Sequence, residues 1–145
     1  MMRDIFAQPG MGFVPPVKKI LVVDEEAGDL RILRLTLEGQ GYRVSTCATY
    51  ESGVQTLEKE PFDFVVVSQG THAFEGRKIV ERAAELDRSQ PVLVLTRCMD
   101  MSCYLEAMQL GAVDYLEKPV PPAELLRFVR AHTEYNRLRG REAAA

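Results

Sequence analysis

The chain has 145 residues, of which 46% are hydrophobic and 27% charged, with a formal net charge of −3. This length suits one domain with tails, and the composition excludes a disordered protein. The mildly negative charge argues against direct binding of nucleic acid, so we expect a small-molecule or protein partner.

The three cysteines, Cys47, Cys98 and Cys103, form no CxxC pair. This argues against both a disulfide framework and a thiolate zinc site, so we expect a cytoplasmic protein with reduced thiols. We expect no membrane span, because no apolar run approaches the ~20 residues that one needs. Residues 1–17 are rich in proline and glycine, lack the apolar core of a signal peptide, and are predicted to form a flexible lead-in.

Strands and helices are predicted to alternate along the chain. Apolar runs predict strands at residues 20–23, 42–47, 64–67, 92–95 and 113–116, of which the second and the fifth give weaker signals. Helical spacing of apolar residues follows at Leu30, Leu33 and Leu37, at Ile79, Val80, Ala83 and Leu86, and at Leu105, Met108 and Leu110. A last helix is predicted to begin at Pro122, because a missing N–H group is harmless in the first turn.

This alternation predicts an α/β fold. We expect a flavodoxin-like, doubly wound (βα)5 three-layer sandwich with right-handed crossovers and a parallel sheet of order 2-1-3-4-5. Functional residues of such folds lie at the carboxyl ends of the strands. The residues that end the predicted strands are Asp24 to Glu26, Ser68, Thr96, Arg97 and Lys118. We therefore predict that these side chains share one pocket.

The acidic residues after the first strand, in VVDEEAGDL, exclude one class of ligand. A nucleotide or flavin phosphate needs glycines and free N–H groups at this turn, whereas Asp24 and Glu25 place negative charge there. Two carboxylates suit a hard cation such as Mg²⁺. The alternative is that residues 24–26 only cap the first helix and interact with its positive end.

The ordered set of VVDEE, Thr96 and the segment YLEKP at 115–119 resembles the receiver domain of bacterial two-component response regulators. The resemblance covers roughly residues 18–132. Thr96 and Lys118 lie 28 and 50 residues after Ser68, the offsets that receivers show from their phospho-accepting aspartate. Gly76 lies where the loop of the family usually has glycine.

The resemblance implies a role for each matching residue. Asp24 and Glu25 correspond to the acidic metal-binding pair, and Thr96 to the hydroxyl that contacts the phosphoryl group. Tyr115 corresponds to the aromatic switch residue and Lys118 to the lysine that pairs with the acceptor. Because these residues are retained, a two-state element is one interpretation. The alternative is that Thr96 and Tyr115 only pack against the core.

Ser68 stands where the family places the phosphorylated aspartate, so the resemblance predicts a degenerate site. A serine hydroxyl is protonated at neutral pH and needs an adjacent base before it can attack a phosphoryl donor. His72 replaces a usual proline, and Arg97 replaces a usual small residue. We expect Arg97 and Lys118 to balance Asp24 and Glu25, with no cofactor and at most weak Mg²⁺ binding. Alternatively, Arg97 points to solvent.

These features together predict an atypical receiver, or pseudo-receiver. We expect it not to be an enzyme and to act in signal transduction as a phosphorylation-independent interaction module. Its partner would be a sensor kinase, an output domain or another signalling protein. One alternative is a receiver phosphorylated at Ser68, or a conventional phosphorelay regulator with an altered site. Another is a small α/β enzyme that uses Asp24, Glu25 and Lys118, but no substrate-pocket signature accompanies them.

The last helix carries a second signal. Phe128, Ala131, Tyr135 and Leu138 form an apolar stripe with heptad-like spacing. We expect the last helices to form a homodimer, or to connect to another domain, with residues 133–145 as a helical extension or linker stub. The alternative is a frayed helix end.

Overall fold

The computed structural model describes residues 16–86 and 88–144, and the side chains only as far as residue 134. Its elements are, in chain order, β1 (Lys19–Val23), α1 (Ala27–Glu38), β2 (Arg43–Cys47), α2 (Tyr50–Lys59), β3 (Phe64–Ser68), α3 (Arg77–Leu86), β4 (Val92–Thr96), α4 (Met101–Gln109), β5 (Asp114–Glu117) and α5 (Pro122–Ala144). All strand pairs are parallel, in the order β2-β1-β3-β4-β5. The predicted fold class is therefore confirmed.

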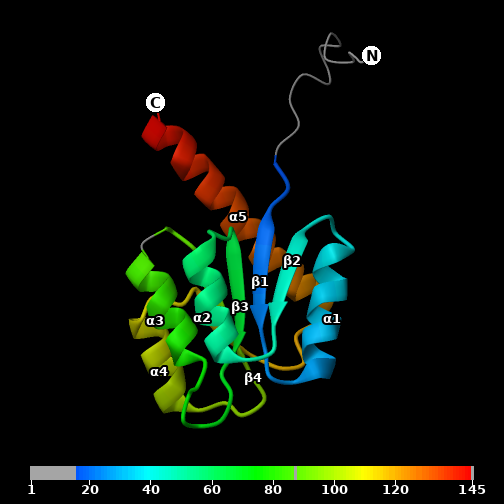
Figure 1. Cartoon of the computed structure of the whole chain (residues 1–145), viewed down its shortest axis with the longest axis vertical. Helices are drawn as coiled ribbons and strands as arrows, with labels where there is room; N and C mark the ends of the chain where they lie inside the picture. Colours follow the sequence, from blue (N-terminus) through cyan, green and yellow to red (C-terminus); the bar gives the residue numbers. More distant parts are fainter. Residues whose placement is uncertain (1–15, 87, 145) are drawn as a thin grey trace.

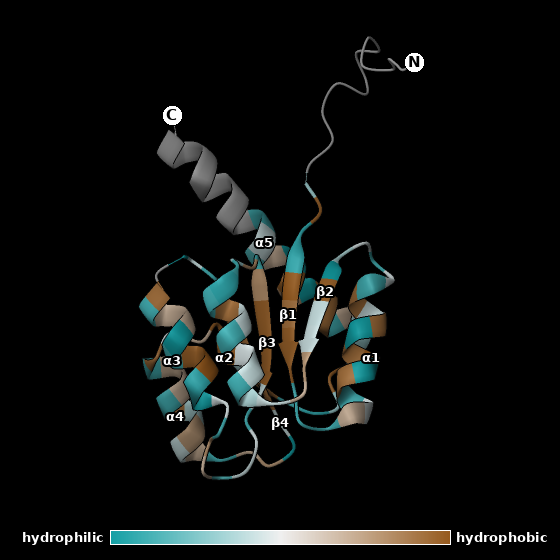
Figure 2. Cartoon of the chain, viewed as in Figure 1, coloured by the Kyte–Doolittle hydropathy of each residue, from teal (hydrophilic) through white to brown (hydrophobic). Residues whose placement is uncertain are grey.

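The sheet is the middle of three layers (Figure 1). One core cluster joins alternate residues of the strands, such as Val23 and Val67, to α2, α3 and α4. The other joins the intervening residues, such as Val22 and Val66, to α1 and α5. Figure 2 shows the apolar colour concentrated along β1 and β3, which are covered on both faces. The uniformly apolar runs therefore predicted these strands well.

The weaker sequence signals belong to the two edge strands. β2 is partly exposed and mixes polar and apolar residues, and it begins one residue after the predicted 42–47. β5 spans Asp114–Glu117, so it lies one residue later than the predicted 113–116. The reason is that Val113 still belongs to the connection, where its N–H group bonds to the carbonyl of Val92. The last helix begins at Pro122, as predicted.

Strand register brings the candidate residues to one edge of the sheet. Val23 pairs with Val67, so Asp24 and Ser68 follow side by side on adjacent strands. The N–H of Lys118 bonds to the carbonyl of Thr96 at 2.7 Å, which aligns the end of β5 with the end of β4. The carboxyl ends of the strands therefore meet at the lower edge in Figure 1.

Two predictions concern parts of the chain that the structure describes little or not at all. Residues 1–15 of the predicted lead-in lie outside the described residues, as do the side chains of Tyr135 and Leu138 in the predicted stripe. The predicted domain boundaries at 18 and 132 stay a prediction. Within the described residues, no helix is long and apolar enough to cross a lipid bilayer.

Gly76 allows the loop after β3 to pass close to the strand end. A Cβ atom at this position would lie 2.2 Å from the carbonyl oxygen of Ser68, whereas a Cβ atom at Gly28 in α1 would meet nothing within 4 Å. We expect Gly76→Ala to lower the free energy of unfolding by about 1–3 kcal/mol, because the backbone must move. The matched Gly28→Ala should be neutral or stabilising by up to about 1 kcal/mol. Urea unfolding of both variants measures the difference, and equal stabilities would contradict the close approach.

Candidate functional site

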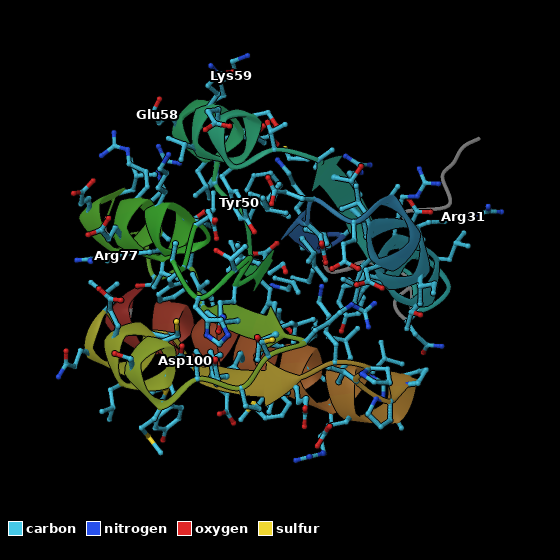
Figure 3. All side chains as sticks on the ribbon, turned by 90° about the horizontal axis from the view of Figure 1, so that it is seen from below. Arg31, Tyr50, Glu58, Lys59, Arg77 and Asp100 are labelled. Carbon is cyan, nitrogen blue, oxygen red and sulfur yellow. The ribbon has the colours of Figure 1, made fainter. Side chains whose placement is uncertain are left out.

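The carboxyl ends of β1, β3, β4 and β5 surround a pocket of about 170 Å³. Its lining residues are Asp24, Glu25, Glu26, Tyr50, Ser68, Gly70, Thr71, Arg97 and Lys118. Figure 3 looks onto this edge, with Tyr50 and Asp100 among the labelled residues. Six of the seven residues that were predicted to share one pocket therefore line it. Thr96, Tyr115 and His72 do not line it.

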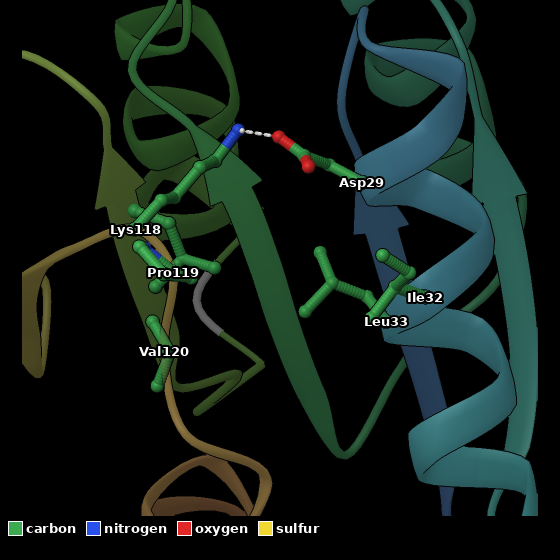
Figure 4. A pocket seen from close by; sticks show the side chains of 7 residues that line it. Asp29, Ile32, Leu33, Lys118, Pro119 and Val120 are labelled. Carbon is green, nitrogen blue, oxygen red and sulfur yellow. Dashed lines mark hydrogen bonds and ion pairs between the residues drawn. The ribbon is translucent and has the colours of Figure 1, made fainter.

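Lys118 is the centre of the pocket. Its side chain comes from the end of β5 and is 5% exposed. The ammonium group donates to Asp24 Oδ2 at 2.8 Å and to Asp29 Oδ2 at 2.9 Å, and it lies 3.2 Å from Ser68 Oγ. Figure 4 shows the bond to Asp29, which reaches across from α1. A buried ammonium is thus paired with two carboxylates and one hydroxyl, as its burial requires.

Asp24 has both carboxylate oxygens engaged. The side chain is 2% exposed, with Oδ2 bound to Lys118. Oδ1 accepts the N–H of Glu26 at 2.9 Å, so it orders the turn that leads into α1. Glu26 is the N-cap residue of α1 but makes no side-chain cap bond. Asp24 therefore binds the lysine and also shapes the start of the helix.

Arg97 does not pair with the carboxylates that we expected. Its Nη2 lies 2.7 Å from both oxygens of Asp29, and its Nε donates to Glu26 Oε1 at 3.0 Å. The charge of Arg97 is therefore balanced by Glu26 and Asp29 and not by Asp24 and Glu25, and the side chain bonds to both although it is about half exposed to solvent. The reason is that Asp24 is buried and bonded to Lys118, whereas Glu26 is exposed and Asp29 is partly exposed. Among the described residues, the ion pairs of this region involve Asp24, Glu26 and Asp29 but not Glu25.

Asp29 is a site residue that the sequence analysis did not single out. It lies in the first turn of α1 and connects Lys118 with Arg97. Burial acts to raise the pKa of Asp29, but the hydrogen bonds and charges of Lys118 and Arg97 outweigh it and hold the pKa below its usual value. The only signal in the sequence was one more acidic residue, five positions after Asp24.

Ser68 is buried and is held from two sides. Its hydroxyl faces Lys118, and its carbonyl oxygen accepts the hydroxyl of Tyr50 at 3.0 Å. Tyr50 comes from α2 and was also missed by the sequence analysis. Burial, together with the charges of Glu25 and Asp24, raises the pKa of Tyr50. The one described hydrogen-bond partner of the Ser68 hydroxyl is an ammonium group, which cannot take its proton, so no described base is bonded to this hydroxyl.

Tyr115 and Thr96 bond away from this pocket. Thr96 Oγ1 bonds to the backbone N–H and carbonyl of Cys98, both at 3.0 Å, so it shapes its own turn. The hydroxyl of Tyr115 donates to the amide oxygen of Gln69 and accepts the N–H of Asp100 at 3.2 Å. Burial raises the pKa of Tyr115. Gln69 is fully buried and, without an apolar or charged signature, could not be singled out from the sequence.

His72 belongs to the hydrogen-bond network of Tyr115 and Asp100, which is separate from the pocket. Its Nδ1 lies 2.5 Å from Asp100 Oδ2, and Asp100 Oδ1 accepts the N–H groups of Ser102 and Cys103 at the start of α4. The bond to His72 lowers the pKa of Asp100, and the cap bonds lower it further. Asp100 thus ties the loop after β3 to the first turn of α4.

The residues at the pocket do not fit a resident Mg²⁺ ion. Mg²⁺ demands near-octahedral oxygen coordination and usually takes one or two carboxylates together with waters. Both oxygens of Asp24 are already bonded, and the Ser68 hydroxyl faces an ammonium group. Within the described part of the chain, no group of three or more His, Cys, Asp or Glu side chains is placed to hold a metal ion.

Comparison with known proteins gives consistent matches. The family model for the response regulator receiver domain matches residues 20–130. The alkaline phosphatase synthesis transcriptional regulatory protein PhoP of Bacillus subtilis is 32% identical over 114 residues, which cover 79% of this chain and 48% of that protein. The transcriptional regulatory protein ZraR of Klebsiella oxytoca is 36% identical over 104 residues, covering 70% and 23% respectively. The chain thus spans half or less of the length of these curated relatives.

Solved structures agree with the fold. A CheY-like response regulator receiver domain protein from Methanospirillum hungatei has a TM-score of 0.80 at 26% identity, covering 86% of this chain and 99% of that chain. A response regulator receiver domain protein from Clostridium thermocellum has a TM-score of 0.77 at 26% identity, covering 84% and 98%.

The lowered pKa of Asp29 predicts a pH-dependent contribution to stability. The unfolded carboxyl takes up a proton more readily than the folded one, so the contribution is complete above about pH 4 and is lost as pH falls through the lower folded pKa. We expect Asp29→Asn to lower the free energy of unfolding by about 1–3 kcal/mol at pH 7, because charged hydrogen bonds are lost. The difference in the free energy of unfolding between the wild type and this variant should shrink towards pH 2.

The test is urea unfolding of the wild type and the variant between pH 7 and pH 2. Glu85→Gln is the control, because Glu85 is a largely exposed carboxylate that also pairs with an arginine. We expect it to change stability by less than about 0.5 kcal/mol. A deficit for Asp29→Asn that stays constant over this pH range would contradict the assignment.

Proposed function

The chain belongs to the response regulator receiver family, and from this premise we propose that it is an atypical receiver that signals by binding other proteins, without aspartyl phosphorylation. The family places it in signal transduction. The observation that carries the proposal is Ser68, which ends β3 beside Asp24 and faces Lys118 at 3.2 Å. This is the position at which the resemblance requires the phospho-accepting aspartate.

The chemistry around Ser68 supports this proposal. An ionised carboxylate attacks a phosphoryl donor directly, whereas a hydroxyl needs a base to remove its proton. Lys118 cannot be that base while it donates to Asp24 and Asp29 as an ammonium. A phosphorylated serine would be a phosphate monoester, which is far longer lived than an acyl phosphate. A fast, self-resetting switch is therefore not expected at this position.

The same contacts argue against an enzyme. The candidate catalytic groups would be Asp24, Glu25 and Lys118. Two of them neutralise each other in a buried pair at 2.8 Å, and Glu25 is exposed at the rim of the pocket. A general acid or base needs a proton that it can exchange with a substrate. We therefore propose a non-enzymatic module.

Exposed apolar side chains offer surfaces for a partner. At the start of α4, Met99, Met101, Tyr104 and Leu105 are all exposed, and Met101 reaches 70%. Clustered apolar residues of this kind mark protein contacts, and methionine adapts to different partners. A second surface is the apolar groove in Figure 4, where Ile32 and Leu33 of α1 face Pro119 and Val120. Its position beside the Lys118–Asp29 pair would let a bound partner sense the site.

We propose a sensor kinase, an output domain or another signalling protein as the partner. The curated relatives are transcriptional regulators at least about twice as long as the matched segment, which supports an output domain as one of these. A homodimer through the last helices is also proposed. α5 has 23 residues, about 35 Å of helix, which extends it well beyond the other helices.

Phosphorylation of the intact chain tests the proposal. We expect incubation with acetyl phosphate and Mg²⁺ to leave the intact mass unchanged, because the Ser68 hydroxyl is uncharged and its described hydrogen-bond partner is an ammonium group, not a base. Mass spectrometry measures the outcome, and a receiver with an aspartate acceptor serves as the positive control for the reagent. A stable gain of one phosphate that Ser68→Ala abolishes would instead establish Ser68 as an unusual acceptor.

A further inference from the structure

Four carboxylates lie in the pocket or bond to its lining residues, and side-chain cations of the chain already bind three of them. Lys118 bonds to Asp24 and Asp29, and Arg97 bonds to Asp29 and Glu26. Only Glu25 lacks such a contact among the described residues. A single exposed carboxylate is a poor start for a Mg²⁺ site, because this ion gives up its waters reluctantly.

The contacts of Arg97 have the geometry of a specific clamp. One guanidinium nitrogen lies 2.7 Å from each oxygen of Asp29, while Nε binds Glu26 at 3.0 Å. The planar guanidinium suits carboxylates better than a lysine ammonium would. The two partners lie three residues apart at the start of α1, so the clamp holds one helix end in a defined orientation. The hydrogen bond to Glu26, followed by the charge of Asp29, raises the pKa of Arg97.

The clamp connects segments that are far apart in the sequence. Asp29 is shared between Arg97 and Lys118, so a continuous chain of ion pairs runs from the end of β5, across the first turn of α1, to the segment after β4. Arg97 directly follows Thr96 and lies three residues before Asp100, the N-cap of α4. The position of the guanidinium therefore constrains the segment that leads into α4.

We propose that the Arg97 guanidinium takes the place of a divalent cation at this pocket and holds the segment between β4 and α4 against α1 without a metal ion or a phosphoryl group. The inference rests on the proposed function and deepens it, because it names the regulation of the same site. The positive charge is part of the chain, so the arrangement depends neither on metal concentration nor on a phosphoryl group.

The Arg97 guanidinium should outcompete Mg²⁺ for these carboxylates. A tethered side chain acts at an effective concentration of millimolar or more, and Mg²⁺ would have to displace it. An incoming ion would also be repelled by both Arg97 and Lys118. Because Arg97 is about half exposed, the clamp is open to screening, and high ionic strength should loosen it.

The test is a Mg²⁺ titration of the full chain. Binding is measured by calorimetry and by the NMR chemical shifts of the amide groups of residues 24–29. We expect no saturable binding in the low millimolar range for the wild type. Arg97→Ala should raise Mg²⁺ affinity on the order of tenfold, because it frees Glu26 and removes a positive charge. Arg97→Lys should raise it less. Arg82→Ala is the matched control, since Arg82 is another arginine bound to two carboxylates, Glu58 and Glu85.

Two further readouts strengthen the test. Hydrogen exchange of residues 97–100 should become faster in Arg97→Ala but not in Arg82→Ala. Ser68→Asp alone should bind Mg²⁺ weakly, whereas Ser68→Asp combined with Arg97→Ala should bind it best and accept phosphate from acetyl phosphate.

The outcomes separate this inference from the proposed function. Low-millimolar Mg²⁺ binding by the wild type would overturn the inference, and so would an Arg97→Ala variant that matches Arg82→Ala in both affinity and exchange. Neither result touches the proposed function while the wild type stays unphosphorylated. Stable phosphorylation of the wild type would overturn the proposed function, whatever the metal titration gives.

Discussion

The buried ammonium of Lys118 is the interaction on which the rest of the site depends. An unpaired charge at this depth would cost several kcal/mol, so folding requires carboxylates close to it. Asp24 supplies one from the end of β1, and Asp29 supplies the other from the first turn of α1. The parallel order that places β1 and β3 beside each other, with β4 and β5 following, brings these groups within reach. Sheet topology and charge neutralisation therefore support each other.

The neutral hydroxyl of Ser68 fits this balance. A carboxylate at position 68 would lie beside Asp24 and would compete with Asp29 for the same ammonium. With serine there, Lys118 has two carboxylates and one hydroxyl around it, and Asp29 remains available to Arg97. In the proposed atypical receiver, Ser68 and the clamp are thus two parts of one arrangement, in which the negative charge lies on Asp29 of α1 and not at the end of β3.

The sequence predicts the fold far better than the partners within the site. Buried strands such as β3 are uniformly apolar, and residues that end parallel strands must meet at one edge, so the convergence of Asp24, Ser68 and Lys118 follows from the pattern. The pattern does not predict which carboxylates Arg97 binds. The acidic residues of segment 24–29 lie close together in the sequence, and only the directions of their side chains distinguish them. Tyr50 and Gln69 were missed for a related reason. Their roles depend on hydrogen bonds across elements, which no periodicity records.

The segment from Arg97 to Asp100 is held at both ends by different networks. Arg97 binds α1, whereas Asp100 binds His72, accepts N–H groups of α4 and donates its own N–H to Tyr115. A change of state must break contacts at both ends, and each contact at an exposed site is worth little by itself. In the proposed two-state element, a partner that reverses a balance from 1:99 to 99:1 would have to bind the other state about 5.5 kcal/mol more tightly. The exposed apolar residues at the start of α4 directly follow this segment, which is where such differential affinity would act most effectively.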